Sequence, residues 1–479
     1  MNLLVIDIGT SSVRAAIVQP DSGVTHQHQR DVLPSSPAPG LVEFDASELA
    51  EAILDVARRA VADIGSVDAV GVANQRTSTV VWDRATGEPV GPALGWQDLR
   101  TVGECLTLGA EGFRISPSAT ATKAAHLLDA HDPGRDRDLC SGTVDSWAAW
   151  TLSNGDLHVT DTTNVAMYGL RADYRSSWHR GLLERLRIEE SSLPTVVDSI
   201  GVIGGATALP GAPPIAGILG DQQASLLGQG CVNPGDAKIT FGTGAMLDLC
   251  LAERPDFATM GEKGTIPIVT RSRDGEHSYG LEGVMLAAGT NIEWLRDDLG
   301  IIASAEQTHE IAARCTDSEG VAYVPALLGL GTPNWDYGAR GALFGITRGS
   351  GRPQIVRAVL EGIAHRAADL VDAAERDGEV SIPAIRVDGG MSTNPTFVQI
   401  LANATQKVVE ISPEVEATTL GAAHAAGLAV GAWSGTDDIG ATWKPDDRVE
   451  PDAETDRERW ADTLRRAEKW FPDLSAITF

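Results

Sequence analysis

The chain has 479 residues, of which 43% are hydrophobic and 22% are charged, so it is long enough for two domains or one large α/β unit. Its 38 basic and 66 acidic residues leave a formal net charge of −28, which argues against a general nucleic-acid binder or a protein of anionic membranes, since both need a basic face. Without a long apolar run or a cationic leader, and with five scattered cysteines that lack metal-ligand spacing, the sequence predicts a cytoplasmic globular enzyme.

The first element that we expect is a β-hairpin. An apolar run at residues 3–6 ends at Asp7, and the small residues 9–12 separate it from a second apolar run at 13–18. In Walker-type and dinucleotide-binding loops the glycine-rich segment leads into a helix instead, and the Walker lysine pattern is absent here. Both of those nucleotide folds are therefore disfavoured.

A second hairpin of the same kind is predicted about half a chain later. Residues 237–241 run into Gly242-Thr243-Gly244, and a second apolar strand follows at 245–250. Two such hairpins favour a duplicated architecture with a boundary near residues 232–235. The alternative is coincidence, because Gly-Thr turns are common.

Helical patterns dominate the remainder of the second half. Residues 353–374 space apolar side chains at threes and fours, and residues 418–428 are rich in Ala, Gly and Leu, which indicates close packing against another element. A helix is expected to start near Pro395. Residues 457–470 predict an amphipathic terminal helix that braces the fold.

Three glycine-rich loops could bind a nucleotide. Backbone N–H groups in the loops at 9–12 and 242–244 can converge on phosphates, helped by Arg14, although both could be ordinary turns. At residues 387–394 glycines would let a flat ring approach the backbone, with Asn394 as its partner. The alternative for Asn394 is a helix N-cap.

Polar side chains that follow apolar runs could bind the second substrate. Asp221 follows the run 215–219 after Gly220, and there it could accept a hydroxyl proton or act as an N-cap. Arg76 and Trp96 also follow apolar runs, and a polyhydroxylated ligand needs such an arginine fork and aromatic platform. Trp96 alone could equally be a core residue.

In order along the chain, these segments resemble the FGGY carbohydrate kinases, and within that family the glycerol kinases. The resemblance covers nearly the whole chain and is carried by DIGTSSVR at Asp7, NQRTSTVVWDRATGEPVGPALGWQDLRT at Asn74, GTVDSWAAWTLSNGDLHVTDTTN at Gly142, GILGDQQASLLGQ at Gly217, FGTG at Phe241, EGVMLAAGTNIEWLRD at Glu282, GLGTPNWDYGARGALFGITRG at Gly329, VDGGMSTNPTF at Val387, and TTLGAAHAAGLAVG at Thr418. It implies an α/β fold of two actin-like (ribonuclease H-like, ASKHA) ATPase domains around a hinged cleft. Residues 1–232 would bind the acceptor, and residues 233–479 would bind ATP and carry the bracing helix.

The resemblance also implies roles for single residues. Those that would meet the transferring phosphates or surround the nucleotide are Thr10, Ser11, Ser12, Arg14, Thr243, Gly289, Glu293, Gly390 and Asn394. Asp221 would be the catalytic base, and Asp7 would organise Mg²⁺ through its water shell. The acceptor site would comprise Arg76, Thr77, Trp96, Ser118, Asp221, Gln222 and Met246.

The acceptor site is where the chain departs from the glycerol kinase pattern. Thr77 stands where those enzymes have Glu, Ser118 where they have Tyr, and Met246 where they have Phe. The family's first signature also expects a Trp soon after Lys123, which is missing, and Glu293 replaces Gln. Glycerol, phosphorylated to glycerol 3-phosphate, remains the best single expectation. A longer polyol or ketose, such as erythritol, xylitol, xylulose or ribulose, is the alternative.

Two rival functions share the fold. An actin-like ATPase that drives conformational change would have no need for Arg76, Trp96 and the Asp221-Gln222 pair. A catalytically idle sugar-binding regulator would have no need to keep the phosphate loops and Asp221. The expected partners are therefore a small polyol or sugar, with neither nucleic acid nor membrane, and the family implies a homodimer or homotetramer.

Overall fold

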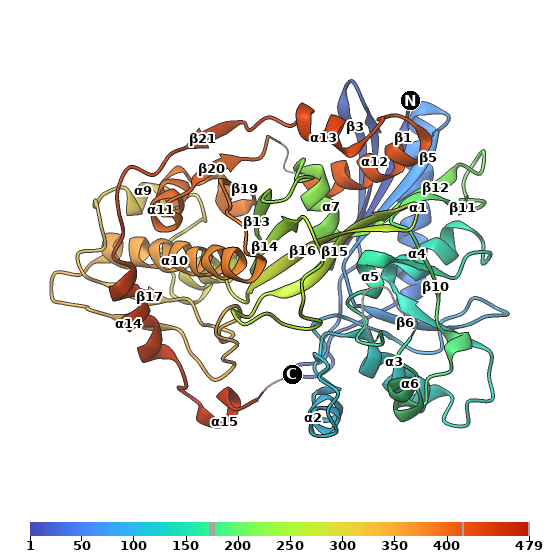
Figure 1. Ribbon diagram of the computed structural model, residues 1–479, viewed down its shortest axis with the longest axis horizontal. Helices are drawn as coiled ribbons and strands as arrows, with labels where there is room; N and C mark the ends of the chain where they lie inside the picture. The colour runs from blue at the N-terminus through green and yellow to red at the C-terminus, as the bar shows by residue number, and fades with distance from the viewer. Residues whose placement is uncertain (172–177, 414–415, 478–479) are drawn as a thin grey trace.

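The computed structural model describes residues 1–171, 178–413 and 416–477. Figure 1 shows most of the second half of the chain on the left and the first half on the right, with residues 417–442 of the second half lying beside the first. A large sheet runs through both halves. The strands described in it are, in spatial order, β21 (Asp447–Val449), β20 (Val408–Ile411), β19 (Ala384–Gly389), β13 (Ala237–Phe241), β14 (Ala245–Leu251), β16 (Glu276–Met285), β15 (Ile266–Arg273), β11 (Ile200–Gly205), β12 (Pro214–Gly220), β5 (Ala69–Asn74), β1 (Leu3–Ile8), β2 (Ser12–Gln19) and β3 (Gly23–Asp31).

Both predicted hairpins are present, and each is part of the same strand arrangement. β1 pairs antiparallel with β2 and parallel with β5, while β3 and β12 extend the two sides. β13 likewise pairs antiparallel with β14 and parallel with β19, while β16 and β20 extend the two sides. The two copies meet between β11 and β15, through the residue pair Ile200 and Arg273. This duplicated α/β architecture agrees with the actin-like fold expected from the sequence.

Helices lie on both faces of the sheet. Those of the first half are α1 (Ala46–Ile64), α2 (Val102–Ala110), α3 (Thr120–His131), α4 (Val144–Leu152), α5 (Thr162–Val165), α6 (Arg180–Leu186) and α7 (Asp221–Gly228). Those of the second half are α8 (Gly289–Glu293), α9 (Gln307–Ala312), α10 (Arg352–Gly378), α11 (Pro395–Thr405), α12 (Ala417–Val430), α13 (Thr436–Thr442), α14 (Arg457–Ala467) and α15 (Pro472–Ser475). The single turns are η1 (Glu190–Ser192), η2 (Trp294–Asp298) and η3 (Gly390–Thr393).

The predicted helices occur close to their expected positions, with one difference. α10, α11 and α12 match the expected segments, whereas α14 ends at Ala467, three residues before the predicted end at Trp470. Glu468 takes an extended backbone and Lys469 has a φ of 55°, so the helix cannot continue through them. The amphipathic pattern of residues 468–470 therefore does not extend the helix.

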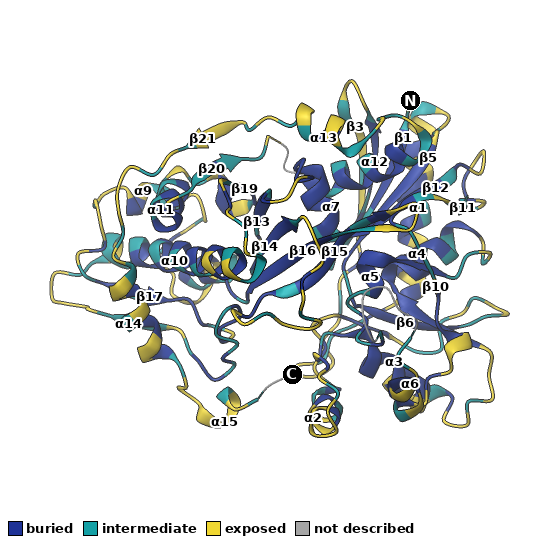
Figure 2. Cartoon of the chain, viewed as in Figure 1, coloured by how far each residue is buried: buried dark blue, intermediate teal, exposed yellow. Residues whose placement is uncertain are grey.

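Side chains along each strand point alternately to the two faces of the sheet, which explains how helices pack on both faces. Leu4 and Ile6 of β1 pack in a cluster with α1, whereas Leu3 and Val5 pack in another with α12. In the second half, β13, β14 and α10 share a large apolar cluster. Figure 2 shows the central strands, α7 and much of α12 in the dark blue of buried residues.

α7 and α12 cross between the two halves with their backbones in close approach. A Cβ atom on Gly421 would lie 1.7 Å from the carbonyl oxygen of Ala224, and one on Gly228 would lie 1.8 Å from that of Ala417. Only glycine fits such distances. The crossing therefore explains why residues 418–428 are so rich in small side chains, as the sequence suggested.

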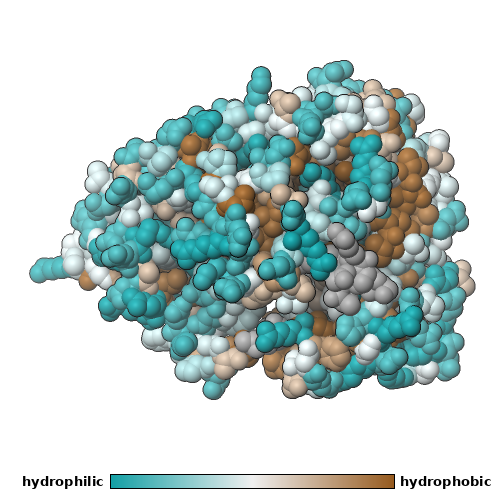
Figure 3. Space-filling view, in the orientation of Figure 1, coloured by the Kyte–Doolittle hydropathy of each residue, from teal (hydrophilic) through white to brown (hydrophobic). Residues whose placement is uncertain are grey.

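Smaller sheets complete the molecule, and they comprise β4 (Glu43–Phe44), β7 (Ala93–Leu94), β6 (Thr79–Asp83) and β8 (Leu139–Thr143) in one, β9 (Val159–Asp161) with β10 (Thr195–Val197), and β17 (Ala322–Val324) with β18 (Ala342–Phe344). Hydrophilic residues cover most of the face drawn in Figure 3, as the many charged residues lead one to expect. Among the described residues, no helix is both long and apolar enough to cross a membrane.

Candidate active site

Three parallel strands of the first half end at one edge of the sheet. In the register of β1, β5 and β12, Ile8 and Gly220 both lie opposite Asn74. Asp7 therefore lies level with the segment that leads to Arg76 and with Asp221, the first residue after β12. The sequence-predicted candidates from three separate segments thus meet at the carboxyl ends of the strands, where ligands of open α/β sheets bind.

The first glycine loop joins β1 to β2 beside Asp7. Its turn is closed by the Gly9 N–H, which donates to the carbonyl of Ser12 at 3.0 Å, and Thr10 and Ser11 lie at its tip. Arg14 lies directly opposite Asp7 in the hairpin. Burial raises the pKa of Asp7 to about 7; Arg14 opposes this rise, and the nearby carboxyls Asp221 and Glu416 add to it. A cation at this position would favour the carboxylate form.

Asp221 begins α7 without capping it. The N-cap position belongs to Gly220, and the Oδ1 atom of Asp221 accepts a hydrogen bond from the N–H of Gln222 at 2.8 Å. The N-cap alternative for Asp221 is therefore wrong. Burial raises the pKa of Asp221, and Arg76, whose Nε lies 3.6 Å from Oδ1, partly offsets that rise. A carboxyl of this kind, partly exposed at a strand end, can accept a hydroxyl proton.

The glycine before Asp221 makes room for the arginine. A Cβ atom on Gly220 would lie 2.7 Å from both the Cδ atom of Arg76 and the Oε1 atom of Gln223. Arg76 therefore packs across the end of β12. Its Nη1 atom is buried without a hydrogen-bond partner among the described residues.

A buried hydrogen-bond network holds the ends of β5 and β12 in place. The Gly220 N–H donates to the hydroxyl of Thr163 at 2.9 Å, and that hydroxyl donates to Asp161 at 2.9 Å. The side-chain amide of Asn164 bonds both Asp161, at 2.8 Å, and Asn74, at 3.1 Å. Because these groups are buried and partnered, they fix the segments that carry Arg76 and Asp221.

The remaining acceptor-side candidates lie on two loops next to the first glycine loop. The indole Nε1 of Trp96 donates to the hydroxyl of Thr10 at 3.3 Å, and 37% of Trp96 is exposed, so it is not a core residue. The buried ammonium of Lys123 donates to the carbonyls of Ser118, at 2.7 Å, and Trp96, at 3.3 Å. Thr77 follows Arg76 with a φ of 61°, rare for a β-branched residue, in a tight turn closed from Ser78 N–H to Arg76 O.

Charged side chains of the second half contact this site, and sequence reasoning did not assign them. Glu282 on β16 accepts from Nη2 of Arg76 at 2.6 Å, and Lys238 on β13 donates to Oε1 of Gln222 at 2.7 Å. Asp248 on β14 lies 2.8 Å from Lys238. A lone aspartate inside the apolar strand 245–250 is the sequence signal that could have revealed it. Met246 lies two residues before it, on the same face of β14.

The second-half candidates gather around the second glycine loop. The N–H of Gly289 donates to the carbonyl of Gly242 at 2.9 Å, and a Cβ on Gly289 would lie 2.6 Å from that oxygen. Thr243 is exposed at the tip of this loop, and Glu293 is exposed at the end of α8. The structure thus brings Thr243 and Gly289 together at the carboxyl end of β13.

The third glycine segment adjoins the second loop through the sheet. Phe241 lies opposite Gly389 in the register of β13 and β19, and Gly390 follows as an exposed residue. Asn394 caps α11, because its Oδ1 accepts from Phe397 N–H at 3.1 Å, while its amide donates to Thr308 at 2.9 Å. The N-cap alternative for Asn394 is confirmed.

An ion pair links the hairpin of β1 and β2 to the start of α12. The Nη1 atom of Arg14 lies 2.5 Å from a carboxylate oxygen of Glu416, the residue before α12. Arg14 also donates to Gln29 at 3.0 Å. Within the described ranges no group of three or more His, Cys, Asp and Glu side chains is arranged to hold a metal ion.

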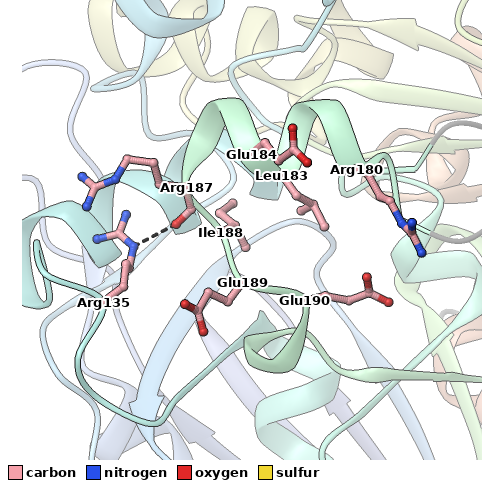
Figure 4. A pocket seen from close by; sticks show the side chains of 8 residues that line it. All are labelled: Arg135, Arg180, Leu183, Glu184, Arg187, Ile188, Glu189 and Glu190. Carbon is pink, nitrogen blue, oxygen red and sulfur yellow. Dashed lines mark hydrogen bonds between the residues drawn. The ribbon is translucent and has the colours of Figure 1, made fainter.

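A surface cavity of about 390 Å³ lies elsewhere, at α6 and the turn after it (Figure 4). Its lining residues are Arg135, Arg180, Leu183, Glu184, Arg187, Ile188, Glu189 and Glu190. The Nε atom of Arg135 donates to the carbonyl of Arg187 at 2.8 Å, so this arginine is engaged within the protein. No predicted site residue lines the cavity.

Comparison with known sequences gives matches over both halves of the chain. Residues 2–228 match the N-terminal domain of the FGGY family of carbohydrate kinases, and residues 237–430 match its C-terminal domain. A glycerol kinase of Aromatoleum aromaticum is 42% identical over 494 residues, covering 98% of this chain and 99% of that protein. A glycerol kinase of Deinococcus radiodurans is 39% identical, with 99% of each covered.

Solved structures match over the same extent. A Plasmodium falciparum glycerol kinase with ADP superposes with a TM-score of 0.90 at 25% identity, covering 100% of this chain and 99% of that one. A xylulose kinase of Lactobacillus acidophilus superposes with a TM-score of 0.84 at 20% identity, covering 99% and 96%, and this likeness concerns the fold alone.

Proposed function

The chain belongs to the FGGY family of carbohydrate kinases, phosphotransferases with an alcohol group as acceptor, and we propose that it transfers the γ-phosphate of ATP to glycerol. The observation that carries this proposal is the position of Asp221, a carboxylate at a strand end that lies 3.6 Å from Nε of Arg76 and close enough to Asp7 to raise its pKa. Glycerol kinases about 40% identical to the chain over nearly its full length support the acceptor.

In this proposal the residues of the chain divide the work by location. Asp221 orients the attacking hydroxyl and takes its proton, while Arg76, Trp96 and Gln222 hold the other hydroxyls. Thr10, Arg14 and Thr243 face the transferring phosphate from two sides. Since phosphoryl transfer depends on in-line placement and charge neutralisation, the chain needs no covalent chemistry of its own.

The site fits Mg²⁺ held mainly by the nucleotide. Mg²⁺ commonly takes one or two protein carboxylates together with substrate phosphates and water. Asp7 supplies a carboxyl that belongs to no cluster of metal ligands among the residues the structure describes, which suits an ion that arrives with ATP. When bound there, the ion would neutralise phosphate charge and keep Asp7 ionised.

A longer polyol or a ketose is the second candidate acceptor. Thr77 and Ser118 are small, and the hydroxyl of Ser118 lies 2.9 Å from that of Ser116, so neither reproduces the Glu or Tyr of the glycerol kinase pattern. A lost contact to a buried hydroxyl costs about 1–3 kcal/mol.

The experiment that tests the function is ADP release with Mg-ATP across glycerol, erythritol, xylitol, ribitol, xylulose, ribulose and gluconate. We expect glycerol to give the highest kcat/KM. A higher value with a longer polyol or ketose would keep the kinase and replace its acceptor. ADP release at one rate with every acceptor and with none would instead identify an ATPase.

A further inference from the structure

A row of buried charges crosses three strands of the second half, on the face that α7 covers. Lys238 of β13 lies opposite Asp248 of β14, which lies opposite Glu282 of β16. Their exposed fractions are 0%, 0% and 2%. Because burying a charge is costly unless it is paired, a row of this kind inside a strand core calls for a specific role.

Both ends of the row contact acceptor-side residues of the first half. At one end the Lys238 ammonium donates to Oε1 of Gln222 at 2.7 Å and to the hydroxyl of Thr240 at 2.8 Å. At the other end Glu282 accepts from Nη2 of Arg76 at 2.6 Å. Gln222 and Arg76 lie in the N-terminal domain of the family, whereas the row lies in the C-terminal domain.

The contact with Lys238 determines which end of the Gln222 amide is available. An ammonium group only donates hydrogen bonds, so the amide oxygen must face it. The NH₂ group of Gln222 is then turned away from Lys238 and remains a donor. The Gln222 side chain is partly exposed at the start of α7, so that donor can meet an oxygen of the acceptor.

Asp248 balances the charge of Lys238. Its Oδ2 lies 2.8 Å from the ammonium, and within the described ranges no other donor bonds to either of its oxygens. Removing Lys238 alone would leave a buried carboxylate beside Glu282 and would be strongly destabilising. The pair must therefore be tested as a unit.

We propose that Lys238, Asp248 and Glu282 are positioning residues for the acceptor, through which the C-terminal domain holds Gln222 and Arg76 in their binding conformations. This inference rests on the proposed function, because it takes Gln222 and Arg76 as acceptor-binding. It assigns a hydrogen-bond-accepting oxygen of the substrate to the NH₂ group of Gln222.

The test compares steady-state constants of the full-length enzyme with glycerol and Mg-ATP. The double variant Lys238→Met/Asp248→Val replaces the buried pair by apolar side chains, which proteins commonly tolerate. We expect its KM for glycerol to rise about tenfold, the worth of a hydrogen bond to a charged group, with its KM for ATP within twofold of wild type.

A background lacking Gln222 separates positioning from general damage. In Gln222→Ala, the double variant should add no further rise in the KM for glycerol, because the group that it positions is gone. A matched control, Lys407→Met/Glu375→Gln, removes a 2.6 Å ion pair away from the site and should leave both KM values unchanged.

The outcomes also separate this inference from the function on which it rests. Wild-type enzyme that turns over none of the polyols or sugars refutes the proposed function, and the inference falls with it. With active wild type, a double variant whose KM for glycerol stays within twofold, or rises equally in the Gln222→Ala background, overturns the inference alone. Should the double variant not fold, Glu282→Gln takes its place: a several-fold rise in that KM supports the row, and no rise overturns it.

Discussion

At the site, Asp7 and Asp221 are two carboxyls that burial makes harder to ionise. Burial is the largest cause of the raised pKa of each. The carboxylate of Asp221 adds to the rise at Asp7, and that of Asp248 adds to the rise at Asp221. Arg14 opposes the shift at Asp7 and Arg76 opposes it at Asp221. A base for a hydroxyl works best when its pKa is raised towards the working pH, so this environment suits the proposed role of Asp221.

The pKa of Asp7, which burial raises to about 7, predicts how activity depends on pH. Since the carboxylate is the form that serves Mg²⁺, kcat/KM should fall as the pH drops through this pKa. A divalent cation stabilises the carboxylate and lowers the pKa, so the acidic limb should lie near pH 7 at low Mg²⁺ and move to lower pH as Mg²⁺ rises. The measurement is kcat/KM against pH at several Mg²⁺ concentrations and constant ionic strength. A limb that stays in place would contradict the role of Asp7.

Substitution of Thr77 tests whether restoring the glutamate of the glycerol kinase pattern at this position improves the use of glycerol as acceptor. In Thr77→Glu, a carboxylate returns next to Arg76, and glutamate avoids the β-branch that suits a φ of 61° poorly. We expect kcat/KM for glycerol to rise about tenfold, the value of one buried hydrogen bond. The neutral control Thr77→Gln should gain less, and equal values for the two variants would rule out a carboxylate contact at this position.

At the residue scale, single motifs revealed only part of the site. Asp221, Arg76 and Trp96 could be proposed because each lies in a short polar or glycine segment that follows an apolar run. Lys238 and Glu282 could not, since their contacts join segments far apart in the chain. Asp248 left a signal as a lone aspartate inside an apolar strand, but that signal does not identify its partners. The roles assigned to the site residues stay predictions.

At the scale of elements, the position of the proposed base depends on how α7 packs against α12. α7 begins with Asp221, and its later turns meet α12 at glycine positions where a Cβ would collide with backbone oxygens. Any shift of α12 is therefore transmitted to the helix that carries the proposed base.

Gly421→Ala tests this crossing. Its methyl carbon would start 1.7 Å from Ala224 O, so the helices must separate, at a cost of about 1–3 kcal/mol or more. We expect a lower urea midpoint and a lower kcat. Gly103→Ala in α2 is the control, because its Cβ would meet no described heavy atom within 4 Å, and it should leave both values near wild type or raise the midpoint slightly. Equal midpoints for the two variants would contradict the close crossing.

Sequence patterns predicted those helices and strands whose positions depend on neighbouring residues in the chain. The two hairpins, α10 and α12 follow from turn residues and apolar spacing, as expected. The N-cap of α7 could not be predicted in this way. Gly220 occupies that position, and a side chain there would collide with Arg76, a residue 144 positions earlier in the chain.

At the scale of the molecule, the two hairpins in the sequence predicted the duplicated architecture. They did not predict how the two halves join into one sheet. The pairing of β11 with β15 and the packing of Ala422 and Ala426 against Leu3 and Val5 join distant parts of the chain. Such contacts leave no local signal. They nevertheless bring the glycine loops of the two halves to the same edge of the sheet, and Arg14 of the first half bonds to Glu416 of the second.

The most direct test of the account is the rate of phosphoryl transfer in a single turnover, measured by rapid quench with Mg-ATP and glycerol for wild type and Asp221→Asn. If Asp221 is the base of an acceptor-dependent kinase, the variant should still bind glycerol but transfer phosphate about 10²–10⁴ times more slowly. Transfer within threefold of wild type, or phosphate passing to water at the same rate with and without glycerol, would contradict it.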